Sequence, residues 1–150
     1  INYTIYDLGK LKMNEIGQYS DSKRIVSIVI GWQLFKENPL FGVGAGDLVP
    51  SVHNIYKERF PTVDKQSRLL PHNQFLRILN SVGVLGLIFL LCFLFYPIFN
   101  KGIIDNPLFA AFIFSITASF FVEGTIENQI GSAYFLIFYF CFYKNRNITI

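Results

Sequence analysis

The chain has 150 residues, 52% of them hydrophobic, and a formal net charge of +3 at pH 7. The first 78 residues hold ten of the 13 lysines and arginines and seven of the 10 acidic residues, so the last 72 residues are almost uncharged. Water-soluble folds avoid so long an uncharged region, which excludes an ordinary soluble domain. We therefore predict an all-α, polytopic membrane protein fragment, and we expect no nucleic-acid partner.

The two cysteines, Cys92 and Cys141, both lie in apolar runs with no histidine or cysteine at metal-ligand spacing. We interpret them as apolar residues rather than as a disulfide or a metal site. The chain begins with Ile1 and has no basic segment followed by a short apolar one, so we predict no signal peptide. We expect it to be the C-terminal part of a larger integral membrane protein.

The first predicted helix starts at Asp21 or Ser22, either of which can cap it, and continues through Lys36. Asn38-Pro39 ends it. Apolar residues recur along this helix at helical spacing and predict one apolar face, which consists of Ile25, Ile28, Val29, Trp32 and Phe35.

Three glycines, Gly42, Gly44 and Gly46, follow this helix and resemble a nucleotide-binding loop only superficially. A Walker loop continues with Gly-Lys-Ser/Thr, whereas Asp47-Leu48 follows here. A dinucleotide-binding loop follows a β-strand, whereas a helix precedes these glycines. We therefore predict that they form a tight turn with positive φ angles. A second, weaker helix is predicted over residues 50–60, with four residues inward: Val52, Ile55, Tyr56 and Phe60.

Three apolar segments follow, and each is predicted to be a transmembrane helix, over residues 79–99, 103–122 and 125–143. A helix needs about 20 residues to cross hydrocarbon about 30 Å thick, and the first segment has that length. The start of the third span has two alternatives. It begins at residue 125 if Glu127 and Asn128 face protein or a water-filled cavity, and at residue 130 if they do not. Residues 1–78 are predicted to form a loop region with amphipathic helices, and a short tail follows the last span.

The orientation of these spans follows from the cations in their short connections. Lys101 lies between the first two spans, whereas Lys144 and Arg146 follow the third, so all three cations lie on one side. We predict that this side is cytoplasmic. Residues 1–78 and the turn at residues 123–129 then lie on the outer side of the membrane.

His72 is the candidate catalytic residue. Asn73 is a good N-cap for a helix that begins at Gln74, so His72 precedes the positive end of that helix dipole, which favours a neutral imidazole. A neutral imidazole can act as a general base on a hydroxyl group. The alternative is that His72 only stabilises the turn through a hydrogen bond.

The loop region is rich in cations, although the positive-inside rule leaves the outer side poor in them. Most of these cations are expected on a solvated face. Such a loop also suits an anionic lipid headgroup or a lipid diphosphate, and arginine binds phosphate oxygens with a forked geometry. The preferred contacts are Arg24, Arg68 and Arg77.

Two glutamates and one tryptophan are candidates for positioning a sugar acceptor. Glu123 and Glu127 flank the turn between the second and third spans, where carboxylates are costly unless they are exposed or partnered. They are exposed, or they pair with loop arginines, or they position a sugar hydroxyl. Trp32 can stack on a sugar ring, although anchoring at the membrane interface explains the aromatic residues equally well.

Two blocks of residues together resemble the O-antigen ligase and polymerase superfamily. The first block is Arg24, then Gly31-Trp32, then Asn-Pro-Leu-Phe-Gly-Val-Gly-Ala-Gly at residues 38–46. The second is His72-Asn73, nine residues, and Gly-Val-Leu-Gly at residues 83–86. The spacing is specific to the superfamily but does not separate its members.

The resemblance implies a multi-pass, metal-independent glycosyltransferase of the inner membrane that needs no cofactor and has residues 1–78 in the periplasm. Such enzymes move a glycan from undecaprenyl diphosphate to an acceptor hydroxyl, which in the ligases of lipopolysaccharide biosynthesis belongs to lipid A-core. The family's essential loop histidine falls on His72, and Arg24 is the best match to an essential arginine that holds the diphosphate. Arg68 and Arg77 stay candidates. Without upstream spans, we predict that this fragment is inactive alone.

Two further functions stay open. A polysaccharide polymerase of the same superfamily would extend another glycan and differs only in its acceptor. A non-catalytic membrane subunit, whose basic loop binds anionic lipid or a partner, predicts instead that replacing His72 leaves function intact. A transporter would need charged or broken residues in mid-span, and none of the three predicted spans has a charge near its centre.

Overall fold

The computed structural model describes residues 20–61, 63–99 and 106–144, and the regular structure of these residues is entirely helical. The prediction of an all-α fold is confirmed. The predicted start of the second span at residue 103, the orientation cations Lys101 and Arg146 and the end of the tail lie outside the described residues.

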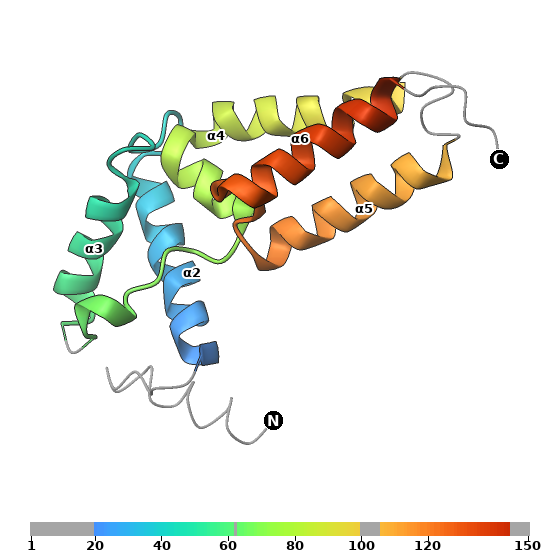
Figure 1. Ribbon diagram of the computed structural model, residues 1–150. Coiled ribbons are helices and arrows are strands. Elements are labelled where there is room, and N and C mark those ends of the chain that lie inside the picture. Colours follow the sequence, from blue (N-terminus) through green and yellow to red (C-terminus); the bar gives the residue numbers. More distant parts are fainter. Residues whose placement is uncertain (1–19, 62, 100–105, 145–150) are drawn as a thin grey trace.

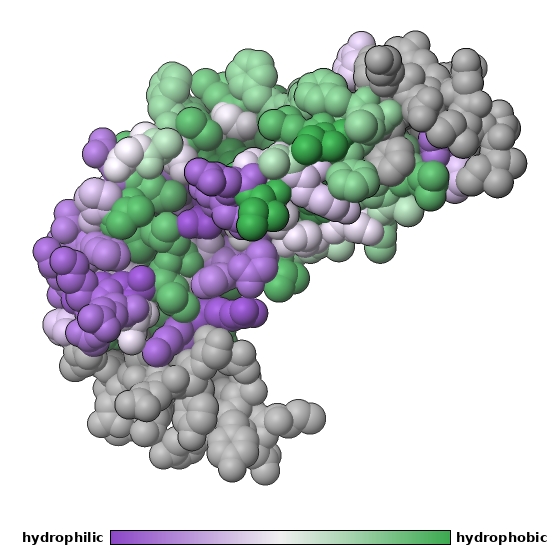
Figure 2. Space-filling view, viewed as in Figure 1, coloured by the Kyte–Doolittle hydropathy of each residue, from purple (hydrophilic) through white to green (hydrophobic). Residues whose placement is uncertain are grey.

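The helices form two groups that meet at one end of the molecule (Figure 1). Helix α2 (Ser20–Glu37) packs against α3 (Leu48–Arg59), which is followed by the short η1 (Lys65–Ser67). Helices α4 (Gln74–Phe95), α5 (Pro107–Val122) and α6 (Gln129–Lys144) form the second group, with η2 (Tyr96–Phe99) and η3 (Thr125–Glu127) at their ends. Hydrophilic residues gather over the first group, whereas hydrophobic residues cover most of the second (Figure 2).

The predicted apolar face of α2 is not the face that packs into the core. Ile28, Val29 and Trp32 are 45%, 50% and 50% exposed, and the residues of α2 that pack into the core with α3 are Val26, Ile30 and Leu34. Both sets have helical spacing, because α2 carries apolar residues on opposite sides, and packing against α3 selects one of them. The helix also begins at Ser20, so neither Asp21 nor Ser22 precedes it as a cap.

Helix α3 confirms the second predicted loop helix, with bounds shifted by one or two residues at each end. Three of the four residues predicted to face inward are buried: Val52, Ile55 and Tyr56. The fourth, Phe60, packs against the same core from the end of the helix.

Helix α4 begins at Gln74, five residues before the predicted span, so the predicted boundary at residue 78 falls inside it. Gly83 interrupts α4 with φ 71° and ψ −167°, which divides the helix into residues 74–82 and 84–95. A side chain at Gly83 would collide with the backbone of Leu40, because the glycine turn between α2 and α3 lies directly against this kink.

The glycine turn replaces helical hydrogen bonds that the kink removes. The amides of Val43 and Gly44 donate to the carbonyls of Asn80 and Ser81, each at 2.8 Å, and the amide of Val84 donates to Pro39 O at 2.9 Å. Gly42 and Gly44 have φ angles of 66° and 93°, as predicted for a tight turn, whereas Gly46 has no positive φ. These glycines therefore serve a backbone junction.

The lengths of the three apolar helices differ from the predicted spans. Among the described helices, only α4, with 22 residues, is long and apolar enough to cross a membrane by itself. Helices α5 and α6 have 16 residues each, and η3 occupies the start of the predicted third span. Aromatic rings fill the space between the helices: Phe93 stacks on Tyr139 with ring centroids 4.6 Å apart, and Phe112 stacks on Phe135 at 6.3 Å.

Candidate functional site

Asn73 joins the start of α4 to the end of α5. Its side-chain oxygen accepts a hydrogen bond from Leu76 N at 2.9 Å, which confirms the predicted N-cap, and its amide nitrogen donates to Phe121 O at 3.2 Å. The residue before Asn73 is therefore held beside the residue that follows α5. These two residues are His72 and Glu123.

Glu123 contacts two candidate site residues with its two carboxylate oxygens. Its Oε2 lies 3.0 Å from His72 Nδ1, and its Oε1 accepts a hydrogen bond from Arg24 Nη2 at 3.3 Å. The hydrogen bond from His72 is the main cause of a lowered pKa of Glu123. Desolvation opposes it, and the charges of His72, Arg24 and Arg77 add to it. Glu123 is therefore a carboxylate at neutral pH.

A carboxylate beside Nδ1 fixes the role of the other ring nitrogen of His72. The proton is held on Nδ1, where it is donated to Glu123, so the neutral imidazole carries its lone pair on Nε2. A histidine with this tautomer can accept a proton at Nε2, and the neighbouring carboxylate stabilises the imidazolium that forms. His72 and Glu123 thus have the arrangement of a base and the residue that orients it.

Gln74 holds the second glutamate. Gln74 is fully buried, and its Nε2 donates to Glu127 Oε1 at 2.9 Å while its Oε1 accepts from Ile126 N at 3.0 Å. The turn between α5 and α6 is therefore fixed to the first turn of α4. Gln74 was not predicted as a positioning residue, although a glutamine in the first turn of an apolar helix is a signal that a polar partner is near.

Arg77 lies one helical turn after Asn73 and packs over Gly124. A Cβ atom at Gly124 would lie 3.0 Å from Arg77 Cδ and 3.2 Å from Arg77 Cζ, so only glycine leaves this space for the arginine. Within the part of the chain that the structure describes, the guanidinium has no hydrogen-bond partner, and its Nε is buried. A guanidinium with free hydrogen-bond donors at the edge of a cavity is suited to an anionic ligand.

A cavity of about 410 Å³ brings most of these residues together. Its volume lies within the range of small-ligand sites, about 300–1,000 Å³. Five of the seven predicted site residues line it, from the loop, from α4 and from the turn between α5 and α6: Arg68, His72, Arg77, Glu123 and Glu127. Arg24 does not line the cavity but reaches its edge through Glu123.

Two predicted site residues have other surroundings than expected. Arg68 lines the cavity, but its Nε donates to Val63 O at 3.2 Å and its Nη1 to His53 O at 3.4 Å, so the loop backbone uses part of its hydrogen-bonding capacity. Trp32 is half exposed, packs on Phe35 with ring centroids 5.4 Å apart, and does not line the cavity.

Comparison with known proteins gives one family. A family model described as O-antigen ligase matches residues 2–91, which is more than half of the chain. The match includes Arg24, Arg68, His72 and Arg77 and ends before Glu123. No curated protein matches the chain.

Proposed function

The chain belongs to the O-antigen ligase family, and from this premise we propose that it transfers a glycan from undecaprenyl diphosphate to an acceptor hydroxyl. The observation that carries the proposal is the pair of His72 and Glu123 at the edge of a cavity that also holds Arg77. The proposed acceptor is a sugar of lipid A-core, as in the ligases of lipopolysaccharide biosynthesis.

The proposed reaction is an inverting displacement at the anomeric carbon of the donor sugar. The acceptor oxygen forms a bond to that carbon while its proton passes to Nε2 of His72. The bond from the carbon to the diphosphate oxygen breaks, and undecaprenyl diphosphate leaves with the electron pair. Glu123 holds the imidazole in position and stabilises the imidazolium, so it is a positioning residue.

The leaving diphosphate gains negative charge, and arginines are the groups that stabilise it in this proposal. Arg77 is the strongest candidate, because its guanidinium lines the cavity with no hydrogen-bond partner among the described residues. Arg24 gives one nitrogen to Glu123 and retains its other donors, and Arg68 contributes charge as a second arginine that lines the cavity. Glu127 and, outside the cavity, Trp32 are proposed to contact the acceptor.

The proposed setting is the inner membrane, with several spans and with residues 1–78 in the periplasm. There the enzyme meets its lipid-linked donor, its acceptor and membrane lipids. We propose that the transfer needs no metal ion and no cofactor, in line with the resemblance described above.

Complementation of a strain that lacks the full-length gene tests this proposal. Wild-type, His72→Ala and His53→Ala proteins are produced at matched membrane levels, and polymeric glycan is followed on its acceptor and on the carrier lipid. His53 is the matched control, because it lies on α3 and does not line the cavity. If the protein is a ligase, the strain with His72→Ala accumulates long glycan on the carrier lipid, and the strains with wild-type or His53→Ala protein do not. If the protein is a polymerase, single repeat units accumulate on the carrier in the His72→Ala strain. Wild-type behaviour of His72→Ala would favour the non-catalytic subunit.

A further inference from the structure

The turn between α2 and α3 presents two large apolar side chains outward. Leu40 is 60% exposed and Phe41 is 72% exposed. Their backbone cannot turn them inward, because hydrogen bonds from both sides of the turn attach it to α4: Val84 N donates to Pro39 O, and Val43 N donates to Asn80 O. The exposure of Leu40 and Phe41 is therefore a fixed property of this turn, which we name the apolar turn (residues 39–41).

The apolar turn meets α4 where the composition of that helix changes. Before the kink, residues 74–82 include Gln74, Arg77 and Asn80. After it, the sixteen residues 84–99 include no charged side chain and, apart from Tyr96, no side-chain amide or hydroxyl group. Such a run spans about 24 Å at a rise of about 1.5 Å per residue, and α5 and α6, with 16 residues each, have the same length. The bundle of three helices therefore has one apolar thickness, and the kink at Gly83 lies at its edge.

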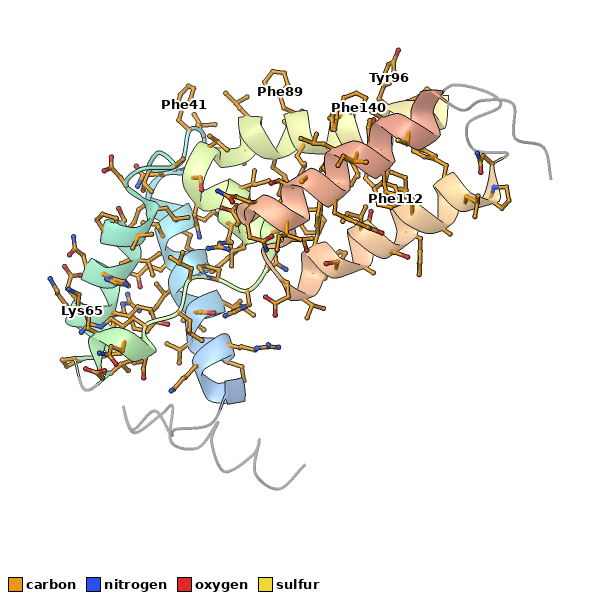
Figure 3. The ribbon with its side chains drawn as sticks, in the orientation of Figure 1. Phe41, Lys65, Phe89, Tyr96, Phe112 and Phe140 are labelled. Atoms are coloured by element: carbon orange, nitrogen blue, oxygen red, sulfur yellow. The ribbon has the colours of Figure 1, made fainter. Side chains whose placement is uncertain are left out.

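The exposed side of α4 continues the surface of the apolar turn. Ile88 and Phe89 are 50% and 75% exposed on the apolar half of the helix. In Figure 3, Phe41, Phe89 and Tyr96 point away from the same side of the molecule, with Phe41 at the end nearest the loop helices. If α4 crosses the bilayer, Phe89 faces lipid, and Phe41 extends that lipid-facing side to the level of the kink.

We propose that the apolar turn inserts into the outer edge of the bilayer, where Leu40 and Phe41 contact lipid acyl chains. Aromatic and aliphatic side chains at the end of an apolar helix bundle are stabilised at this depth. Part of the cost of bringing this backbone near hydrocarbon is already met, because Pro39 has no amide hydrogen and its carbonyl accepts from Val84 N, while the two amides that follow the turn, Gly42 and Val43, donate to Asn38 O and Asn80 O. The turn thereby sets the depth of residues 74–82, and with them the distance of His72 from the membrane surface.

Site-specific fluorescence quenching tests the insertion in the full-length protein in lipid nanodiscs. All native cysteines, including Cys92 and Cys141, are replaced by alanine, and single cysteines are labelled with bimane at Phe41→Cys, Phe89→Cys and Glu58→Cys. Phe89 is the lipid reference, and Glu58, exposed on α3, is the water reference. Quenching is measured with lipids that carry a nitroxide on the acyl chain and with iodide in water.

The expected result is loss of bimane fluorescence at position 41 with nitroxide lipid, comparable to the loss at position 89, and little loss with iodide. Iodide quenching equal to that at position 58 would place the turn in water and overturn the proposal. Protection from both quenchers would show that protein covers the turn, which overturns it as well. Leu40→Cys repeats the measurement if Phe41→Cys does not assemble. None of these outcomes depends on the proposed transferase activity.

Discussion

Glu123 links His72, Arg24 and the cavity through one carboxylate. Because its side chain and that of Arg24 are nearly half exposed, solvent screens their attraction, and the ion pair adds little to stability. Its main effect is on geometry, since the contact at 3.0 Å orients the His72 ring and selects the proton position. The interactions of Glu123 therefore bear on catalysis more than on folding.

Replacement of Glu123 by glutamine tests this role at nearly constant size. The amide oxygen still accepts a hydrogen bond from His72 Nδ1, but the negative charge that stabilises the imidazolium is lost. We expect kcat to fall by about 10²-fold, within the range for a general base that loses its support, with KM for the donor nearly unchanged. Glu58→Gln on α3 is the control in the same steady-state assay. Equal kcat for the two variants would contradict an orienting role.

The lowered pKa of Glu123 also predicts a pH dependence of stability. Folding holds the carboxyl in its ionised form, so the stability it contributes is complete above its ordinary value of 4.5 and is lost as the pH falls through the lowered pKa. We expect the thermal midpoint of the purified full-length protein to fall more steeply below this pH in wild type than in Glu123→Gln. Parallel curves for the two proteins would count against the contact with His72.

Gly124 offers a way to move Arg77 without changing it. An added methyl group would press on Cδ and Cζ of Arg77, a flexible side chain that can shift, so Gly124→Ala should displace the guanidinium and leave the fold intact. We expect a higher KM for the lipid-linked donor and an unchanged thermal midpoint. The effect should disappear in an Arg77→Gln background, because both changes then remove the same contact. Additive losses in the double variant would refute this coupling.

At the scale of elements, the junction between the glycine turn and α4 decides how α2 and α3 sit against the group of α4, α5 and α6. Gly31 adds to it, since a Cβ atom there would lie 2.6 Å from Pro71 Cγ, so α2 crosses the start of α4 at close range. The two contacts fix the loop carrying His72 between α2 and α4.

Gly83→Ala should break this junction. Its φ of 71° with ψ of −167° is a conformation that essentially only glycine adopts, and a methyl group would also collide with Leu40. We expect a loss of stability of at least about 1–3 kcal/mol, which is the usual range for such backbone strain. The thermal midpoint of the full-length protein measures it. Gly46→Ala, where the added atom meets nothing within 4 Å, should behave like wild type.

Local signals in the sequence were sufficient for some elements and insufficient for others. The cap of α4 by Asn73 and the end of α2 before Pro39 depend on neighbouring residues, so the sequence predicts them. The buried face of α2 depends on which neighbour packs against it, so the predicted apolar face, which includes the exposed Ile28 and Trp32, is not the buried one. The kink at Gly83 was missed, because a glycine in an apolar run has the same appearance in a straight helix.

In the candidate site, too, the residue types could be predicted from the sequence, whereas their contacts could not. His72 and the arginines were identified from residue type and spacing, and Glu123 and Glu127 from their cost near a bilayer. The contact between His72 and Glu123 joins residues 51 positions apart. It depends on hydrogen bonds between elements, such as those of Asn73 with Phe121 and of Gln74 with Glu127. No periodicity in the sequence contains this information.

At the scale of the whole molecule, the apolar thickness of the three-helix group is its most restrictive property. Sixteen residues in α5 and in α6 extend about 24 Å, which is less than the usual hydrocarbon thickness of about 30 Å. A bilayer adapts to a short bundle by thinning around it, at a cost that grows with the mismatch. The site at residues 72–77 and 123–127 lies at one end of this bundle and shares its depth.

We therefore expect the activity of the full-length protein to depend on bilayer thickness. In proteoliposomes of phosphatidylcholines with increasing acyl-chain length, kcat should be highest in the thinner bilayers and fall as the hydrocarbon becomes thicker than the bundle, because a thick bilayer covers the cavity or tilts the helices. Soluble donor analogues with short lipid chains serve as a control. They reach the cavity from water, so their transfer rate depends only on the position of the cavity relative to the membrane surface. A rate that rises with thickness would contradict this expectation and show that the lengths of α5 and α6 do not determine the depth of the site.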